Sequence, residues 1–304
     1  MIEQEITFRS NGVTLAGTIT LPGNEGPYPG ALFIPGSGMV DRDENHKKMA
    51  INSFNELAGH LARQGFASLR YDKRGVAASQ GSFLSAGFYD NAADAGAGFA
   101  CLREHEKVDS GRVFIIGHSE GALIASRLAG EGTPAAGIAL LAGTAQPGGH
   151  VLRWQAGEIA KHIQGFQKKL ITLLRIDPRK SQEKILTKIA ASDKEVMRVQ
   201  LVVKINAKWM REFMAYNPAD DLAKTSCPVL AVTGGHDIQV DPADINRMQE
   251  IVPSPFEGHV VPEVSHMLRK GELGMADYKR QIKLPLDREV VSLLLDWLKR
   301  QTGT

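Results

Sequence analysis

The pentapeptide Gly117-His118-Ser119-Glu120-Gly121 constrains the fold of this chain more than any other segment. The apolar run before it, residues 113–116, is typical of a buried strand, and residues 122–129 after it are typical of a helix. A sharp strand–helix turn exposes its central residue, and the flanking glycines let the backbone pack closely around it. We therefore expect Ser119 to stand at the end of a strand as a nucleophile. The alternative is an ordinary turn in which Ser119 caps the helix.

Two later strands are followed by residues that could activate a serine. Residues 228–233 form a short apolar strand that leads to Asp237, and residues 258–262 form the last predicted strand, before His266. A serine hydroxyl is a weak nucleophile unless a base stands beside it, and a carboxylate commonly orients that base. The pattern predicts a catalytic set in the chain order Ser119, Asp237, His266.

Other histidines and one other aspartate compete for these roles. His259 lies inside an apolar strand and is expected to be structural, whereas His236 would need a different acid as its partner. His118 lies within the turn itself and is expected to point away from the position of a base. Asp241 precedes a proline and has the position of a helix cap. Asp237 and His266 therefore remain the first choice for the residues that activate Ser119.

Taken together, these motifs resemble those of the α/β-hydrolase family. The matching pieces are the pentapeptide around Ser119, Gly235-His236-Asp237 followed by Val240, Ser265-His266, and Pro35-Gly36-Ser37-Gly38-Met39-Val40-Asp41-Arg42-Asp43 after an apolar strand at 31–34. The Gly-Ser-Gly followed by Asp-Arg-Asp, with Glu120 after the serine, is similar to a bacterial serine esterase subgroup. The resemblance covers the chain apart from residues 145–226.

The resemblance implies a division of roles within the site. Ser119 would attack an acyl carbon, His266 would act as the general base, and Asp237 would hold the imidazole in place. The backbone N–H groups of Glu120 and Ser37 would stabilise the oxyanion, with Gly38 as the alternative to Ser37 and as a substrate contact. Many family members carry His-Gly where this chain has Pro35-Gly36, so the oxyanion segment is assigned by position.

The order of elements predicts an α/β-hydrolase fold with a mostly parallel sheet. Strands alternate with helices along the chain, and residues 6–9 and 13–21 around Asn11-Gly12 predict an antiparallel hairpin at one edge. Ligands bind beyond the carboxyl ends of parallel strands, where all the candidate site residues fall. Residues 72–75 follow another such strand and are interpreted as a structural turn. We expect a core of residues 1–144 and 227–304, with a helical cap at 145–226.

The predicted cap differs from the core in composition. Residues 151–176, 182–191 and 194–215 are predicted helices. The segment carries 15 Lys and Arg against 8 Asp and Glu, a net charge of +7, while the remainder has a net charge of −5. The first interpretation is that these charges are solvated helix faces. The second is that a basic cap attracts anionic acyl substrates.

Large side chains in the same segment are candidates to line an acyl pocket: Trp154, Phe166, Trp209, Met210 and Phe213. Trp209 and Phe213 are four residues apart and so share a helix face. Such a stripe more often forms the core of a cap than a ligand contact. If these side chains do close the pocket, short or medium acyl chains are expected.

The composition excludes several other classes of protein. The chain has 304 residues, 43% hydrophobic and 23% charged, which is typical of a globular protein, and a net charge of +2 gives no reason to propose nucleic-acid binding. Its two cysteines do not suggest a disulfide framework. No signal peptide, membrane span or cluster of metal ligands is visible, so we expect a cytoplasmic enzyme with no metal, no cofactor and no membrane partner.

We therefore predict a hydrolase of small-molecule carboxylic esters of short to medium acyl length. An acyl-CoA or other thioester hydrolase is the main alternative, supported only by the basic cap. A catalytically inactive binding protein is less favoured because all three chemical positions are filled. A haloalkane dehalogenase would carry Asp at position 119, and nothing recognisable would clamp a peptide amine. Assembly into a homo-oligomer is left open.

Overall fold

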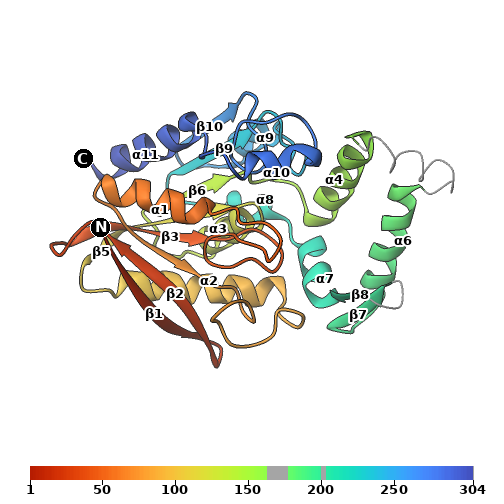
Figure 1. The fold of residues 1–304 in the computed structure, drawn as a ribbon, viewed down its shortest axis with the longest axis horizontal. Coiled ribbons are helices and arrows are strands. Elements are labelled where there is room, and N and C mark those ends of the chain that lie inside the picture. Colours follow the sequence, from red (N-terminus) through yellow and green to blue (C-terminus); the bar gives the residue numbers. More distant parts are fainter. Residues whose placement is uncertain (163–176, 200–202, 304) are drawn as a thin grey trace.

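The computed structural model describes residues 1–162, 177–199 and 203–303. Eight strands form one sheet in the order β1-β2-β4-β3-β5-β6-β9-β10 (Figure 1). Their bounds are β1 Ile2–Ser10, β2 Val13–Leu21, β3 Tyr28–Ile34, β4 Ala67–Tyr71, β5 Val108–His118, β6 Gly137–Leu141, β9 Val229–Gly234 and β10 Phe256–Val261. Strand β2 is antiparallel to both of its neighbours, β1 and β4, and all the other pairs are parallel. The predicted α/β-hydrolase fold is confirmed.

Helices cover both faces of the sheet and bury two apolar layers. Helices α1 (Ser53–Arg63) and α11 (Arg288–Thr302) cover one face, where Phe54 and Leu294 are fully buried (Figure 1). On the other face, α2 (Phe88–Arg103) and α3 (Glu120–Gly130) bury their apolar sides, together with the smaller helices α8 (Pro218–Leu222) and α9 (Asp244–Ile251). Strands buried on both sides have few polar positions, which explains their continuous apolar runs.

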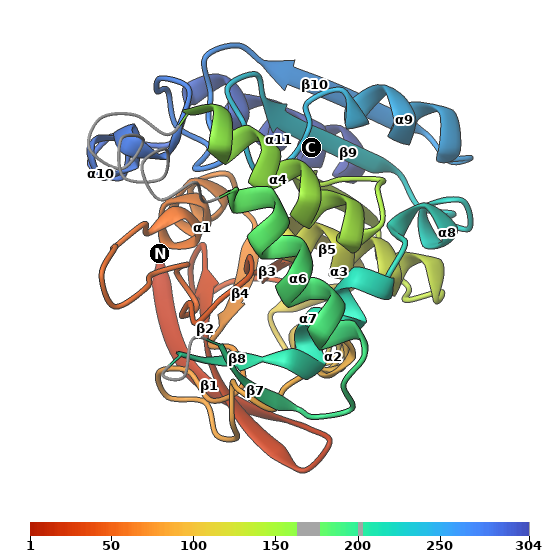
Figure 2. The same cartoon turned by 90° about the vertical axis from the view of Figure 1, so that its right-hand side faces the viewer.

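The segment predicted as a cap lies beyond the carboxyl ends of the parallel strands. It contains α4 (Gly148–His162), α6 (Pro178–Ala190), the two-stranded sheet of β7 (Val196–Val199) and β8 (Val203–Asn206), and α7 (Ala207–Ala215). Figure 2 shows α4, α6 and α7 in front of the sheet. Helices α4 and α6 pack on each other and on α7, which packs on α2. The limits 145–226 stay a prediction, and we call these residues the cap segment.

The prediction of one helix over residues 194–215 is wrong in its first half. Residues 196–199 and 203–206 form the antiparallel strands β7 and β8, and α7 begins only at Ala207. Val196, Val199, Val203 and Ile205 are β-branched, which favours strands over helices. The predicted helix 151–176 corresponds to α4, but its residues after 162 lie outside the described part of the chain. The predicted helix 182–191 corresponds to α6, which begins four residues earlier, at Pro178, because the side chain of Asp177 caps its N-terminus.

Two short helical elements follow β10 in the chain: η1 (Met275–Asp277) and α10 (Tyr278–Gln281). Residues 35–52 connect the carboxyl end of β3 to α1, and we call them the β3–α1 loop. In the residues that the structure describes, no helix combines the length and the apolar character needed to cross a bilayer.

Candidate active site

Ser119 occupies a strained turn between β5 and α3. Its backbone has φ 54° and ψ −116°, a conformation that non-glycine residues rarely adopt, and Ser119 N donates to the carbonyl of Leu141 at 2.9 Å. A Cβ on Gly121 would lie 1.9 Å from the carbonyl oxygen of Ile34, and one on Gly117 would lie 2.1 Å from the carbonyl oxygen of Gly121. Only glycine fits at both flanking positions, so the turn needs the Gly-x-Ser-x-Gly pattern.

His266 and Asp237 meet at the carboxyl ends of the neighbouring strands. Nδ1 of His266 lies 2.8 Å from Oδ2 of Asp237, and both residues are 4% exposed. The other carboxylate oxygen, Oδ1, accepts from the backbone N–H groups of Gln239 at 2.7 Å and Val240 at 3.0 Å. Because both oxygens are engaged, the carboxylate is held in one orientation toward the imidazole. The sequence-predicted acid and base are thus in direct contact.

A cavity of about 270 Å³ opens beside Ser119 and His266. Its walls come from the β3–α1 loop, the turn at Ser119 and residues 266–278. Apolar side chains supply most of this wall: Met39, Val40, Met49, Ile51, Met267 and Met275. Tyr278 adds a polar group whose hydroxyl accepts from Gln239 Nε2 at 3.2 Å. Burial raises the pKa of Tyr278 to about 12.

The predicted oxyanion segment lines the same cavity. Ser37 and Gly38 are exposed at its rim, and Gly38 has φ 95°, which favours glycine. Ser37 makes no hydrogen bond with any described residue, so its N–H is free to donate. Just before it, a Cβ on Gly36 would lie 3.4 Å from the Cβ of Ser119, which places this backbone directly against the nucleophile.

The side chain of Glu120 does more than the sequence analysis anticipated. Its carboxylate is buried and accepts from Lys73 Nζ at 2.9 Å, Asn91 Nδ2 at 3.0 Å and Trp209 Nε1 at 2.6 Å. Lys73 also donates to the carbonyl oxygen of Gly36 at 3.0 Å. Four separate parts of the fold therefore meet at this carboxylate. The segment 72–75 was interpreted only as a turn, and no local pattern marks Lys73 as its partner.

Trp209 and Phe213 lie on α7, stacked at 4.8 Å between ring centroids. Phe213 is 6% exposed and packs against Phe88 of α2. Neither aromatic side chain is among the residues that line the cavity beside Ser119. Their contact with a substrate stays a prediction, and Phe166 lies outside the described residues.

The competing residues have other partners. Oδ1 of Asp241 accepts from the N–H of Ala243, as a cap does, and His236 Nδ1 bonds to the carbonyl of Gly271 at 2.7 Å. His259 is half-buried on the edge strand β10 and bonds to Glu257 at 2.9 Å. His118 lies closer to the site than expected, with its ring centroid 5.0 Å from that of His266.

Among residues 1–162, 177–199 and 203–303, no group of three or more His, Cys, Asp or Glu side chains could hold a metal ion. The two cysteines, Cys101 and Cys227, are not joined in a disulfide.

Similarity to known proteins agrees with this geometry. Esterase EstD of Thermotoga maritima is 28% identical over 304 residues, an alignment that covers 97% of this chain and 67% of that protein. Est1E of Butyrivibrio proteoclasticus, solved with ferulic acid, has a TM-score of 0.67 at 15% identity over 98% of this chain and 100% of its own. The α/β hydrolase GrgF of Penicillium sp. sh18 has the same TM-score at 16% identity, with both chains covered completely. These two structures show the shared fold.

A family model provides the assignment. The model described as serine aminopeptidase, S33, matches residues 48–272, which include the Ser119 turn, Asp237 and His266. The chain belongs to this family and is an α/β hydrolase.

Proposed function

We propose that this protein is a carboxylic ester hydrolase that works through an acyl-enzyme on Ser119. The observation that carries the proposal is the meeting, at one cavity, of a serine on a strained turn with a histidine bonded to a buried aspartate. The similarity to Esterase EstD supports esters as the substrate class. The family description names a peptidase, but one fold carries out many different reactions, so family membership does not fix the bond that is cleaved.

The reaction would proceed in two halves. In the first, His266 takes the proton of Ser119 Oγ as that oxygen attacks the acyl carbon, and the resulting imidazolium returns the proton to the departing alcohol. In the second, His266 takes a proton from water, the hydroxide attacks the acyl-enzyme, and Ser119 regains its proton as the acid leaves. Asp237 holds the tautomer with its proton on Nδ1 and stabilises the imidazolium.

Backbone donors would stabilise the charge that develops on the acyl oxygen. The N–H of Ser37 has no competing acceptor among the described residues, and the N–H of Glu120 belongs to the first residue of α3. A helix N-terminus also favours negative charge. Loss of one such donor typically costs about 2.7–4 kcal/mol of transition-state stabilisation.

The cavity supports a preference for short or medium acyl chains. Its volume of about 270 Å³ lies just below the range of about 300–1,000 Å³ that is usual for ligand sites. Methionine side chains make up much of the wall, and they adapt to ligands of different shape. Thioesters remain the second candidate, supported by the basic cap segment. A cytoplasmic location, a homo-oligomer and an inactive binding role stay predictions to be tested separately.

The test is a panel of p-nitrophenyl esters of increasing acyl length, with an acyl thioester and an aminoacyl p-nitroanilide in parallel. We expect ester hydrolysis with an optimum at short or medium length that disappears in Ser119→Ala. Ser126→Ala is the matched control, because Ser126 lies on α3, which begins directly after Ser119, and among the described residues its hydroxyl bonds only the carbonyl of Ala122. Ester hydrolysis that survives Ser119→Ala would overturn the nucleophile, and a preference for the thioester or the amide would overturn the substrate class.

A further inference from the structure

Glu44, which follows Asp41-Arg42-Asp43, has no role in the mechanism above, yet it lines the cavity beside Ser119. Glu44 is 3% exposed and has a positive φ of 66°, which turns its side chain away from the course of the loop. Its Oε1 accepts from the N–H of Gly36 at 2.9 Å and lies 2.7 Å from Nδ1 of His118. Glu44 therefore joins the β3–α1 loop to the residue immediately before Ser119.

His118 extends this connection to the loop of the general base. Its Nε2 lies 3.0 Å from the backbone carbonyl oxygen of His266. The ring thus faces a carboxylate oxygen at one nitrogen and a carbonyl oxygen at the other, and both are acceptors. Only an imidazolium donates from both nitrogens. The contacts therefore describe a buried ion pair of Glu44 and His118.

The electrostatics of the two groups agree with this assignment. Burial alone would lower the pKa of His118, but the neighbouring Glu44 carboxylate outweighs it and raises this pKa. Burial alone would raise the pKa of Glu44, but the charge and hydrogen bond of His118 outweigh it and lower this pKa. Both shifts favour the charged forms at neutral pH.

The buried ion pair of Glu44 and His118 is not expected to serve the stability of the fold alone. Taking both charges out of water is costly, and a well-packed apolar pair of similar volume is often as stable. In addition, Oε2 of Glu44 is buried and has no hydrogen-bond partner among the described residues, although the side chain lines the cavity. A buried carboxylate oxygen without a partner adds a further cost. This cost is expected where a geometry is being held for function.

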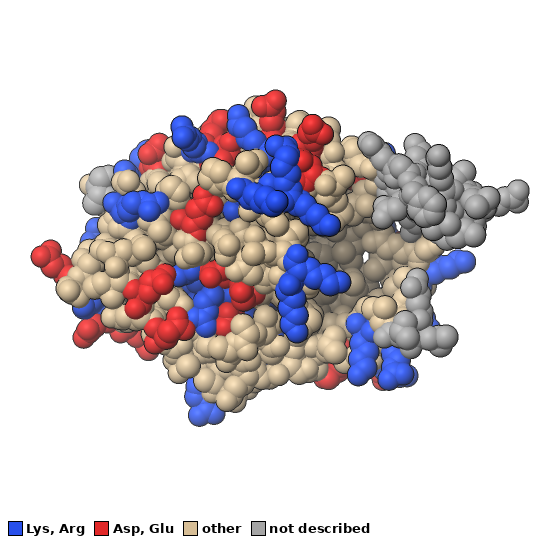
Figure 3. Space-filling view, viewed as in Figure 1, with Lys and Arg blue, Asp and Glu red and all other residues tan. Residues whose placement is uncertain are grey.

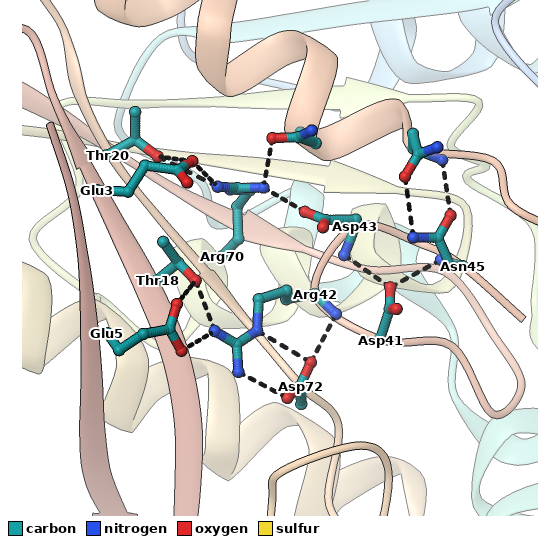
Figure 4. A network of polar contacts seen from close by, with 12 residues as sticks. Glu3, Glu5, Thr18, Thr20, Asp41, Arg42, Asp43, Asn45, Arg70 and Asp72 are labelled. Carbon is teal, nitrogen blue, oxygen red and sulfur yellow. Dashed lines mark hydrogen bonds and ion pairs between the residues drawn. The ribbon is translucent and has the colours of Figure 1, made fainter. Parts of the chain in front are cut away.

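The outer side of the β3–α1 loop is fixed to the sheet, which lets Glu44 act as a rigid support. Figure 4 shows Arg42 between Asp72 and Glu5, and Arg70 in contact with Asp43. Nε of Arg42 lies 3.1 Å from one oxygen of Asp72, and a second guanidinium nitrogen lies 2.8 Å from the other. The loop is therefore held to the sheet at the two residues that directly precede Glu44.

We propose that Glu44 and His118 are positioning residues that hold three segments in register: the β3–α1 loop with its oxyanion donor, the Ser119 turn and the loop of His266. The proposal rests on the proposed function and adds two residues to its site. The pair acts on kcat, because it sets distances among the reacting groups and makes no use of substrate binding energy. A displacement of about 1 Å in such groups can cost about 10²-fold in rate.

Kinetics of Glu44→Gln, Glu44→Ala and His118→Phe test this role. We expect kcat to fall by about 10²-fold in Glu44→Ala and His118→Phe, with KM nearly unchanged. Glu44→Gln keeps an acceptor for the N–H of Gly36 and should fall between wild type and Glu44→Ala. The control is Asp94→Asn, which disrupts another buried ion pair, with Arg74, and should lower thermal stability while keeping kcat. Wild-type kcat in the Glu44 variants, with a loss of stability like that of the control, would overturn the proposal.

A second readout does not depend on turnover. The low-field proton resonance of the hydrogen bond between His266 Nδ1 and Asp237 should shift or broaden in Glu44→Gln and stay in place in Asp94→Asn. If wild type hydrolyses no ester, the proposed function fails, whereas this resonance still tests the positioning role. An unchanged resonance in every Glu44 and His118 variant would overturn that role whatever the activity of the enzyme.

Discussion

The β3–α1 loop and the cap segment flank Ser119 but are attached to the sheet in contrasting ways. The β3–α1 loop is tied down by charge: Arg42 bridges Asp72 and Glu5, and Arg70 contacts Asp43 (Figure 4). In the described part of the cap segment, α4 and α6 pack on α7, and α7 packs on α2. The attachment of α7 includes hydrogen bonds from Trp209 to Glu120 and from Asn206 to the carbonyl of Ala86.

This difference suggests that the two segments have different functions. The proposed oxyanion donor of the β3–α1 loop would need to hold its distance to the reacting atoms, and several ion pairs on one short segment suit that need. A segment that covers a substrate can adjust to different ligands if its outer helices rest on one inner helix. The β3–α1 loop is thus attached directly to strands of the sheet, whereas the described helices of the cap segment are attached through α7 and α2.

The largest expected effect is the loss of kcat when the proposed acid is replaced, and the effects on the two segments are compared with it. Asp237→Asn should lower kcat by about 10⁴-fold, because an amide does not hold the imidazole tautomer that the base requires. The measurement is the initial rate on the preferred p-nitrophenyl ester. Asp241→Asn is the matched control, since Asp241 caps the turn before α9 and should leave the rate near wild type. If Asp241→Asn lowered kcat more than Asp237→Asn does, Asp241 rather than Asp237 would be the acid that orients the imidazole.

Removing an anchor of the β3–α1 loop comes next. Arg42→Met leaves the Asp72 carboxylate, 2% exposed, without its bidentate partner, and should destabilise the fold by about 3 kcal/mol. Urea unfolding measures this change. The control Arg300→Met removes an exposed pair with Glu257, whose contribution is about 0–1 kcal/mol. Equal losses in the two variants would mean that the loop is not held more firmly than an ordinary surface.

A smaller effect is expected on the cap side. Trp209→Phe removes the indole N–H that donates to Glu120, a charged acceptor, and should cost about 1.5–3 kcal/mol in unfolding free energy. Trp154→Phe is the control, because the Trp154 indole makes no hydrogen bond with the described residues. The acyl-length optimum of Trp209→Phe is also informative. A shifted optimum would place Trp209 against the substrate, and an unchanged one would contradict the predicted contact.

The smallest effect concerns the charge of the cap segment. Figure 3 shows a hollow beside this segment, with Lys and Arg side chains at its rim. If this charge attracts anionic substrates, raising ionic strength from about 0.01 M to 0.15 M should lower kcat/KM more for an anionic ester than for a neutral one, since the Debye length falls from about 30 Å to 8 Å. An equal change for both esters would favour the interpretation of solvated helix faces.

Regular elements of the fold could be predicted because their signals are local. The strand at residues 228–233 and the helix at residues 122–129 follow directly from apolar runs and helical period. The β7–β8 hairpin was missed because its strands are only four residues long and lie among helix-forming Lys, Arg and Glu. The β-branched residues of the hairpin carried the correct signal.

The residues of the candidate site could be predicted only where a nucleophile, an acid or a base follows the end of a strand. Ser119, Asp237 and His266 follow three strands of one sheet, so topology brings them together. Glu44 lies 74 residues from His118, and Lys73 lies 47 residues from Glu120. A lone buried charge becomes recognisable only when its distant partner is placed beside it. The positive φ of Glu44 gave no signal either, because glutamate has no preference for that conformation.

The most direct test of the acyl-enzyme is to trap it. The protein is mixed with its preferred p-nitrophenyl ester, quenched in acid during turnover, digested and analysed by mass spectrometry, with Ser119→Ala in parallel. We predict an added acyl mass on the peptide that contains Ser119 and none in the variant. Steady hydrolysis with the acyl group on another residue, or an equal label in Ser119→Ala, would contradict the account.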